Sequence, residues 1–268
     1  FKFSLPKIKG FEFRDEMMDG FHVIAGKKTG TKPDRAVVYF PGGGSRRWQL
    51  PYRGSIRNYI EGTGAELWIP LYPLLPDYDL MDETEFTIRL HEKMLKRFPA
   101  ENIVWLGISG GADILMQAGR HMVKKYPELP MPGLTLPVSV SGLLMSEDAK
   151  TRMRGIDSRD PILHWDMFET MVKYYNPNGD LPQYILGKAD EDDYTGFPKI
   201  IMYFGGDEVF AGIAPDYEKS FIRCGVKDYE IKIKEGMPHA YPVFTFLKEG
   251  REGEREIIAD INRYFESR

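Results

Sequence analysis

The chain has 268 residues, of which 42% are hydrophobic and 28% are charged, and its formal net charge is −4. This composition is typical of a folded globular protein and leaves room for one large α/β domain or two small ones. The slight acidic excess excludes a general electrostatic attraction to nucleic acid or to an anionic membrane, so neither is expected as a partner.

The cysteine count and the lengths of the apolar runs indicate in which compartment of the cell the protein is expected. Cys224 is the single cysteine, which excludes an intrachain disulfide and any Cys-x-x-Cys site for a metal or for redox chemistry. No apolar run approaches the length of a membrane span, and no secretory signal is visible at the start. We therefore expect a cytoplasmic protein without stable membrane insertion; nothing in the sequence indicates an oligomeric state.

Segments rich in β-branched and aromatic residues predict seven strands along the chain. The first is expected to be an edge strand, followed by a turn over residues 26–30. The predicted strands are residues 21–25, 35–40, 66–72, 102 to the glycine turn at 107, 136–142, 199–205 and 229–234.

Helices are predicted between most of these strands from apolar spacing and terminal signals. In the second of them, Asp82 is placed to act as the N-cap. The predicted helices are residues 51–62, 82–98, 110–126, 165–175, 214–224 and 253–265.

Strands that alternate with helices favour a mostly parallel central sheet flanked by helices on both faces, in a single domain over residues 1–268. The alternation is interrupted at about 145–197 by a stretch rich in charge and aromatics. An insert of this length between regular elements is usually functional, so we expect a helical or irregular cap there.

The sequence Gly107-Ile108-Ser109-Gly110-Gly111 fits the G-x-S-x-G nucleophile elbow. It lies between a predicted strand and a predicted helix, where the glycines allow a tight turn with the serine at its tip. The helix that follows directs its free N–H groups back at Ser109. Because chance can produce so short a pattern, the prediction of a nucleophile depends on the surrounding strand ends.

A serine hydroxyl needs a base to accept its proton and an acid to orient that base. His239 directly follows the last predicted strand, so its ring can reach the elbow. The orienting acid is expected after the preceding strand, where Asp207 is the first acid past the turn glycines and Glu208 is the rival. His91 and His121, within predicted helices, are expected to be surface or packed residues. His22 falls in or beside a strand, and His164, in the insert, could face the cleft.

A second glycine run, Pro41-Gly42-Gly43-Gly44, also follows a strand. The carboxyl ends of parallel strands meet at one edge of a sheet, so this run is expected beside the elbow. The backbone N–H groups of Gly43, Gly44 and Gly110 are then candidates for an oxyanion hole. Pro41 has no N–H and can donate nothing.

These motifs make the chain resemble the hormone-sensitive-lipase-like esterases of the α/β-hydrolase fold. The resemblance rests on Pro41–Gly44, on Gly107–Gly111, on Asp207, and on His239 in His-Ala-Tyr. It covers the chain from about residue 30 to the end. It implies a carboxylester hydrolase for short- to medium-chain acyl esters that acts through an acyl-enzyme and needs no cofactor or metal.

The chain departs from the pattern of that family at three positions. Pro41 stands where the family has a histidine that braces the glycine loop. Ile108 stands where an acid usually precedes the nucleophile, and Glu208 where a proline commonly follows the catalytic aspartate. The first and second departures put the brace of the loop and the range of substrates in question.

The cleft walls are expected to come from large side chains near the strand ends and in the insert. The candidates are Trp48, Tyr72, Met145, Trp165, Met167 and Phe168. A small-molecule ester is the expected partner. Two alternatives stay open: an amidase or peptidase with the same triad, and a non-catalytic small-molecule-binding module on a hydrolase scaffold.

Overall fold

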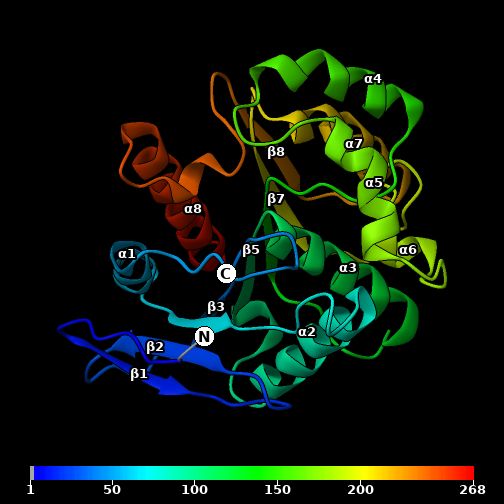
Figure 1. Ribbon diagram of the computed structural model, residues 1–268. Helices are drawn as coiled ribbons and strands as arrows, with labels where there is room; N and C mark the ends of the chain where they lie inside the picture. Colours follow the sequence, from blue (N-terminus) through cyan, green and yellow to red (C-terminus); the bar gives the residue numbers. More distant parts are fainter. Residues whose placement is uncertain (1–2) are drawn as a thin grey trace.

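Eight strands form one sheet in the computed structural model, which describes residues 3–268 apart from the side chain of Glu169 (Figure 1). The strand order across the sheet is β1-β2-β4-β3-β5-β6-β7-β8. Strand β2 runs antiparallel to both of its neighbours, and every other neighbouring pair is parallel. The strands are β1 Phe11–Asp15, β2 Val23–Lys28, β3 Ala36–Phe40, β4 Glu66–Pro70, β5 Ile103–Ile108, β6 Leu134–Val138, β7 Lys199–Gly205 and β8 Tyr229–Lys234.

Helices cover both faces of the sheet, as predicted (Figure 1). Helices α1 and α8 pack on one face through an apolar cluster that they share with the sheet, and α2, α3 and α7 pack on the other. Helices α4, α5 and α6 belong to the insert. The helices are α1 Arg53–Thr63, α2 Leu80–Leu95, α3 Gly110–Lys125, α4 Glu147–Ile156, α5 Asp166–Tyr175, α6 Gln183–Leu186, α7 Ala214–Arg223 and α8 Lys248–Glu266.

The prediction at the start of the chain is wrong in two respects. Strand β2 is not an edge strand, because it lies between β1 and β4, and its residues 26–28 were expected in a turn. Gly26 belongs in the strand because the ring of Phe13 covers it so closely that an added Cβ would overlap the ring. The true edge, β1, is short and only partly buried, so its pattern is weak in the sequence.

Helix α8 starts at Lys248, five residues before its predicted start, and includes two glycines that favour a loop in sequence. Gly250 and Gly253 lie where a side chain would collide with Phe244 and Tyr241. Their lack of a Cβ lets α8 approach the short loop that follows His239. Each glycine destabilises the helix by about 1 kcal/mol relative to alanine, but it permits the close contact between α8 and this loop.

The insert contains more helix than its sequence suggests. Helix α4 was not predicted, because only Ala149 and Met153 along it are buried and its apolar spacing is therefore weak. Ser146 caps it by accepting a hydrogen bond from the N–H of Ala149 at 3.0 Å. Helix α5 agrees with the predicted helix at 165–175 to within one residue.

No helix within residues 3–268 is both long enough and apolar enough to cross a membrane.

The N-terminus of α2 differs from the predicted cap. Asp79, not Asp82, is the N-cap, and the two residues form a reciprocal capping box. The N–H of Asp82 donates to Oδ1 of Asp79 at 2.8 Å, and the N–H of Asp79 donates to Oδ2 of Asp82 at 3.0 Å. The helix therefore begins at Leu80, which places Glu83 in its first turn.

Replacing Asp79 with Ala should lower the free energy of unfolding by about 0.5–2 kcal/mol, because one helix N–H loses its acceptor. Urea unfolding followed by circular dichroism measures the change. Asp77→Ala is the matched control, since Asp77 is an exposed acid two residues away and outside the capping box. Equal losses in both variants would contradict the assignment of the cap.

Candidate active site

Ser109 occupies a sharp turn between β5 and α3 with φ 52° and ψ −124°, a strained conformation for a residue with a side chain. The glycines around it are required by close contacts. A Cβ on Gly107 would lie 2.5 Å from the carbonyl oxygen of Gly111, and one on Gly110 would lie 2.8 Å from the nitrogen of Gly44. The elbow predicted from the sequence is therefore present, with its serine half-buried at the tip of the turn.

His239 connects Ser109 to an acid. Its Nε2 lies 2.9 Å from Ser109 Oγ, and its Nδ1 lies 2.7 Å from Oε2 of Glu208. The edge-on ring of Phe210 packs against the imidazole, with centroids 5.1 Å apart. In the neutral ring, Nδ1–H donates to Glu208 and Nε2 accepts from the serine hydroxyl, which is the arrangement needed for proton removal.

The structure corrects the predicted acid from Asp207 to Glu208. Asp207 forms an ion pair with Arg159 at 2.9 Å, and its side chain is 28% exposed, whereas the side chain of Glu208 is fully buried. The N–H of Asp207 donates to the carbonyl of Met237, and this bond turns residue 207 outward and residue 208 inward. The longer glutamate side chain then reaches the histidine from one position further along the loop.

Glu208 is held by bonds to both of its carboxylate oxygens. Its Oε1 accepts from the Ser139 hydroxyl at 2.9 Å and from the Gly205 N–H at 2.8 Å. Burial raises the pKa of Glu208, while the hydrogen bonds to His239, Ser139 and Gly205 act in the opposite direction. Ser139 also accepts from the N–H of Ala240 at 2.9 Å and so ties the acid to the loop that carries the base.

The glycine run after β3 lies against the elbow. A Cβ on Gly42 would be 3.3 Å from the Cβ of Ser109, and Gly43 and Gly44 have φ values of 124° and 59°, which favour glycine. Within residues 3–268 the N–H groups of Gly43, Gly44 and Gly110 donate no hydrogen bond to the protein. These unpaired donors beside a serine are what an oxyanion hole requires.

Two tyrosines brace the glycine run although Pro41 replaces the expected histidine. The Tyr72 hydroxyl donates to the carbonyl of Pro41, and the Tyr175 hydroxyl donates to the carbonyl of Gly44, each at 2.6 Å. Tyr72 is buried, so its predicted place in the cleft wall is wrong. Trp48, also predicted in the wall, instead donates from Nε1 to the carbonyl of Tyr72 at 3.0 Å.

Glu83 supplies a third brace. The Ser45 hydroxyl donates to its Oε2 at 2.9 Å, while its Oε1 has no partner within the described chain. Burial raises the pKa of Glu83 well above its ordinary value of 4.5, and the nearby Asp113 adds to this effect. Burial therefore favours the neutral form of the Glu83 carboxyl, which accepts the hydrogen bond from Ser45.

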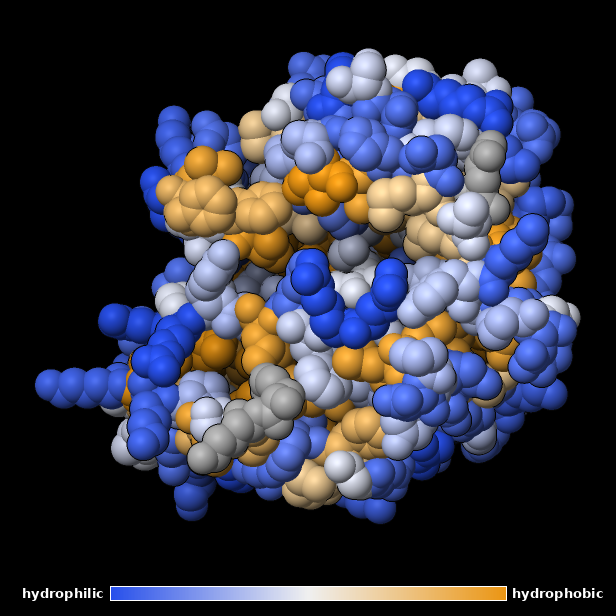
Figure 2. Space-filling model, in the orientation of Figure 1, coloured by the Kyte–Doolittle hydropathy of each residue, from blue (hydrophilic) through white to orange (hydrophobic). Residues whose placement is uncertain are grey.

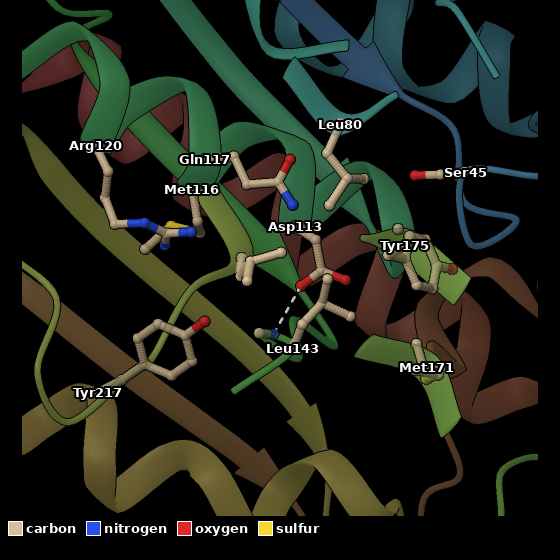
Figure 3. A pocket seen from close by; sticks show the side chains of 13 residues that line it. Ser45, Leu80, Asp113, Met116, Gln117, Arg120, Leu143, Met171, Tyr175 and Tyr217 are labelled. Atoms are coloured by element: carbon tan, nitrogen blue, oxygen red, sulfur yellow. Dashed lines mark hydrogen bonds between the residues drawn. The ribbon is translucent and has the colours of Figure 1, made fainter. Parts of the chain in front are cut away.

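A cavity of about 20 Å³, the size of a single water, lies behind the glycine run (Figure 3). Helix α3 directs Asp113, Gln117 and Arg120 toward it, and Ser45 and Tyr175 lie on its other side. Asp113 accepts hydrogen bonds from the N–H and hydroxyl of Ser141 and from the N–H of Gly142. Its carboxylate thereby holds the loop after β6 in place.

Ser109 and His239 open into a cavity of about 1070 Å³, visible in Figure 2 as a hollow bordered by hydrophobic side chains. Met167 and Phe168 line it, as predicted. Met145 and Trp165 line a neighbouring cavity of about 540 Å³ instead, which Phe168 separates from the first. Lining residues that the sequence analysis missed include Arg46, Arg47, Met171, Tyr174, Tyr175, Phe210 and Phe244.

Three of the missed residues carry a signal that could have identified them. Met171, Tyr174 and Tyr175 follow Met167 and Phe168 at helical spacing, so all five residues share one side of α5. A face of this kind on a helix of the insert is directed at the cleft, not at the core of the sheet.

None of the other histidines lines the cavity, and His164, which could have faced the cleft, does not. His91 is buried against Trp105, and burial lowers its pKa to about 4. His121 contacts Glu85 and Tyr184. The remaining two, His22 and His164, lie beside Asp15 and Asp157. Within the described chain, no group of three or more His, Cys, Asp or Glu side chains could hold a metal ion.

Comparisons with known proteins agree with this fold. A family model described as the alpha/beta hydrolase fold matches residues 37–243. No protein in the curated set matches the chain in sequence.

Solved structures of esterases share the fold. An esterase from the bacterial hormone-sensitive lipase family is 19% identical, with a TM-score of 0.82, over 97% of this chain and 86% of that chain. A hormone-sensitive lipase from a metagenome library is 22% identical, with a TM-score of 0.79, over 97% and 88%. The esterase EstE5, soaked with p-nitrophenyl butyrate, is 17% identical, with a TM-score of 0.79, over 98% and 87%.

The two adjacent acids can be separated by mutation. Glu208→Gln should lower kcat for an activated ester by about 10³- to 10⁴-fold, because the amide favours the wrong tautomer of the histidine. Asp207→Asn removes only a partly exposed ion pair with Arg159 and should change kcat by less than about 3-fold. Steady-state kinetics on both variants, with thermal midpoints as a check of folding, decide the matter. A larger loss for Asp207→Asn would refute the assignment of Glu208.

The raised pKa of Glu83 predicts how stability depends on pH. In the unfolded chain this carboxyl ionises near its ordinary value of 4.5, but the folded protein holds the proton to higher pH. The unfolded state then binds fewer protons, so the free energy of unfolding falls as pH rises above about 4.5. Glu83→Gln cannot ionise, and the wild-type protein should lose stability relative to this variant between pH 5 and 8. Urea unfolding at both pH values measures the difference, and parallel changes would contradict a raised pKa of Glu83.

Proposed function

Because the chain belongs to the α/β-hydrolase fold family, we propose that it is a serine carboxylester hydrolase that acts on short- to medium-chain acyl esters. The observation that carries the proposal is the continuous chain of hydrogen bonds from Ser109 through His239 to the buried Glu208. This arrangement, with unpaired backbone donors beside the serine, is that of a nucleophile and its base.

The reaction follows from the positions of these groups. His239 Nε2 accepts the proton of Ser109 as Oγ attacks the ester carbonyl, and Glu208 stabilises the imidazolium that results. The Gly43, Gly44 and Gly110 N–H groups bind the oxyanion. His239 then returns the proton to the departing alcohol, leaving an acyl-enzyme. A water molecule that loses its proton to His239 cleaves the acyl group from Ser109.

We also propose that residues 145–197 act as a cap on this single domain. Helix α5 gives the cleft one wall through Met167, Phe168 and Met171, and Tyr175 bonds to the glycine run. A cap of this kind excludes water from the acyl group while the oxyanion forms.

The apolar walls support an ester with an uncharged alcohol over a peptide, which needs partners for its amide groups. A matched pair of p-nitrophenyl butyrate and butyryl p-nitroanilide separates esterase from amidase activity. Faster turnover of the anilide would favour the amidase alternative. The intact triad argues against a non-catalytic binding module.

Ser109→Ala should lower kcat on p-nitrophenyl butyrate by about 10⁴-fold or more, since among the described residues no other hydroxyl contacts the base. A fluorophosphonate probe, followed by peptide mass spectrometry, should label Ser109 in the wild-type protein. Ser141→Ala is the matched control, because Ser141 lines the same cavity but donates its hydroxyl to Asp113. Labelling of Ser141, or full turnover by Ser109→Ala, would refute the proposed nucleophile.

A further inference from the structure

Two arginines stand at the mouth of the cleft, directly after the candidate oxyanion donors. Arg46 and Arg47 are exposed and line the cavity that contains Ser109. Figure 2 shows strongly hydrophilic side chains across the middle of an otherwise hydrophobic opening. Two adjacent positive charges at the mouth of the cleft are unexpected in a protein of formal net charge −4 and require an explanation.

Neither guanidinium has an acidic partner within the described residues. The contact that Arg46 makes is with the ring of Tyr174, whose centroid lies 4.7 Å from its Cζ. A guanidinium that stacks on a ring keeps its N–H groups directed outward in its own plane, where they can bind a carboxylate. The stacking also holds Arg46 toward helix α5 and over the cleft.

The cavity itself contains no charge that balances them. Of the residues that line it, Asp113 is the one acid, and its oxygens accept bonds from Ser141 and Gly142. Burial raises the pKa of Asp113, while these hydrogen bonds and the charge of Arg120 act in the opposite direction. A substrate in this cleft therefore meets two positive charges and no free negative charge among the described lining residues.

The order of the strands decides which part of an ester the arginines face. Strand β5, which carries Ser109, lies between β3 on one side and β6, β7 and β8 on the other. Arg46 and Arg47 follow β3, and His239 follows β8, so the loops that carry the arginines and the base approach the nucleophile from opposite sides of β5. Because the departing alcohol oxygen must reach His239 to take its proton, the acyl group extends toward the arginines.

We propose that the preferred substrates are esters whose acyl group ends in a carboxylate, that is, monoesters of dicarboxylic acids, with Arg46 and Arg47 as the binding site of that carboxylate. The inference rests on the esterase activity proposed above and defines its substrate class. The alcohol is left apolar by this assignment, because Phe210 lines the cavity and packs against the ring of His239.

Two p-nitrophenyl esters of equal length test the proposal, namely the hemiglutarate and the valerate, which differ by a terminal carboxylate in place of a methyl group. The wild-type protein should have the higher kcat/KM on the hemiglutarate. Exchanging both arginines (Arg46→Gln with Arg47→Gln) should lower the ratio of the two kcat/KM values by about 10- to 100-fold, the range for charge-assisted hydrogen bonds. Changing both to Lys should lower it less, since charge remains without the planar fork.

Arg53→Gln is the matched control for charge, because Arg53 is exposed at the start of α1 and does not line the cavity. It should leave the ratio within about 2-fold of the wild-type value. A wild-type preference for the valerate, or the same ratio in the double Gln variant, would overturn the proposal.

A second pair of substrates tests the assignment to the acyl side. The butyryl ester of 4-hydroxybenzoate carries its anion on the alcohol, and the butyryl ester of methyl 4-hydroxybenzoate does not. A preference within this pair that depends on the arginines would overturn the acyl assignment. Failure of the esterase function would look different, because neither valerate nor hemiglutarate would then be cleaved and Ser109 would resist the fluorophosphonate probe.

Discussion

The candidate site depends on a carboxylate that is buried without access to water. A buried charge is costly unless hydrogen bonds replace its hydration, and Glu208 receives three, from His239, Ser139 and Gly205. Each partner comes from a different strand end, after β8, after β6 and at the end of β7. The acid therefore does more than orient the imidazole. It joins three loops that share no sequence neighbourhood, and a shift in any of them would leave the charge partly unpaired.

The glycine run on the other side of Ser109 is stabilised by side-chain hydrogen bonds. Tyr72 and Tyr175 donate to its carbonyls, and Ser45 donates to the buried carboxyl of Glu83. The N–H groups of Gly43 and Gly44 have no acceptor within the described residues and lie beside the elbow. Fixed dipoles of this kind stabilise a developing oxyanion without reorganisation. Where a bracing histidine was expected at position 41, the braces come instead from the segment after β4, from α2 and from α5.

The strands and site residues that were predicted correctly are those for which residue type and spacing are compatible with a single structure. Strands β7 and β8 have their predicted bounds, and Ser109 and His239 meet because their strand ends share one edge of the sheet. The choice between Asp207 and Glu208 depended on how the backbone turns after Gly205. That turn is fixed by the hydrogen bond from the N–H of Asp207 to the carbonyl of Met237, 30 residues further along the chain. Tyr72 was misplaced for a similar reason: an aromatic residue at a strand end can face the cleft or brace it, and only packing distinguishes the two.

Helix α5 ties substrate binding to the oxyanion donors. Its adjacent residues Tyr174 and Tyr175 contact adjacent parts of the glycine loop, the first stacking on Arg46 and the second donating to Gly44. Movement of α5 as a rigid body would shift both contacts together. If the proposed substrate class is right, a carboxylate bound at Arg46 is connected through the tyrosine ring and α5 to the Gly44 peptide. Binding energy from a remote carboxylate would then help to position the donors at the reacting carbonyl, which is where it raises kcat and not affinity alone.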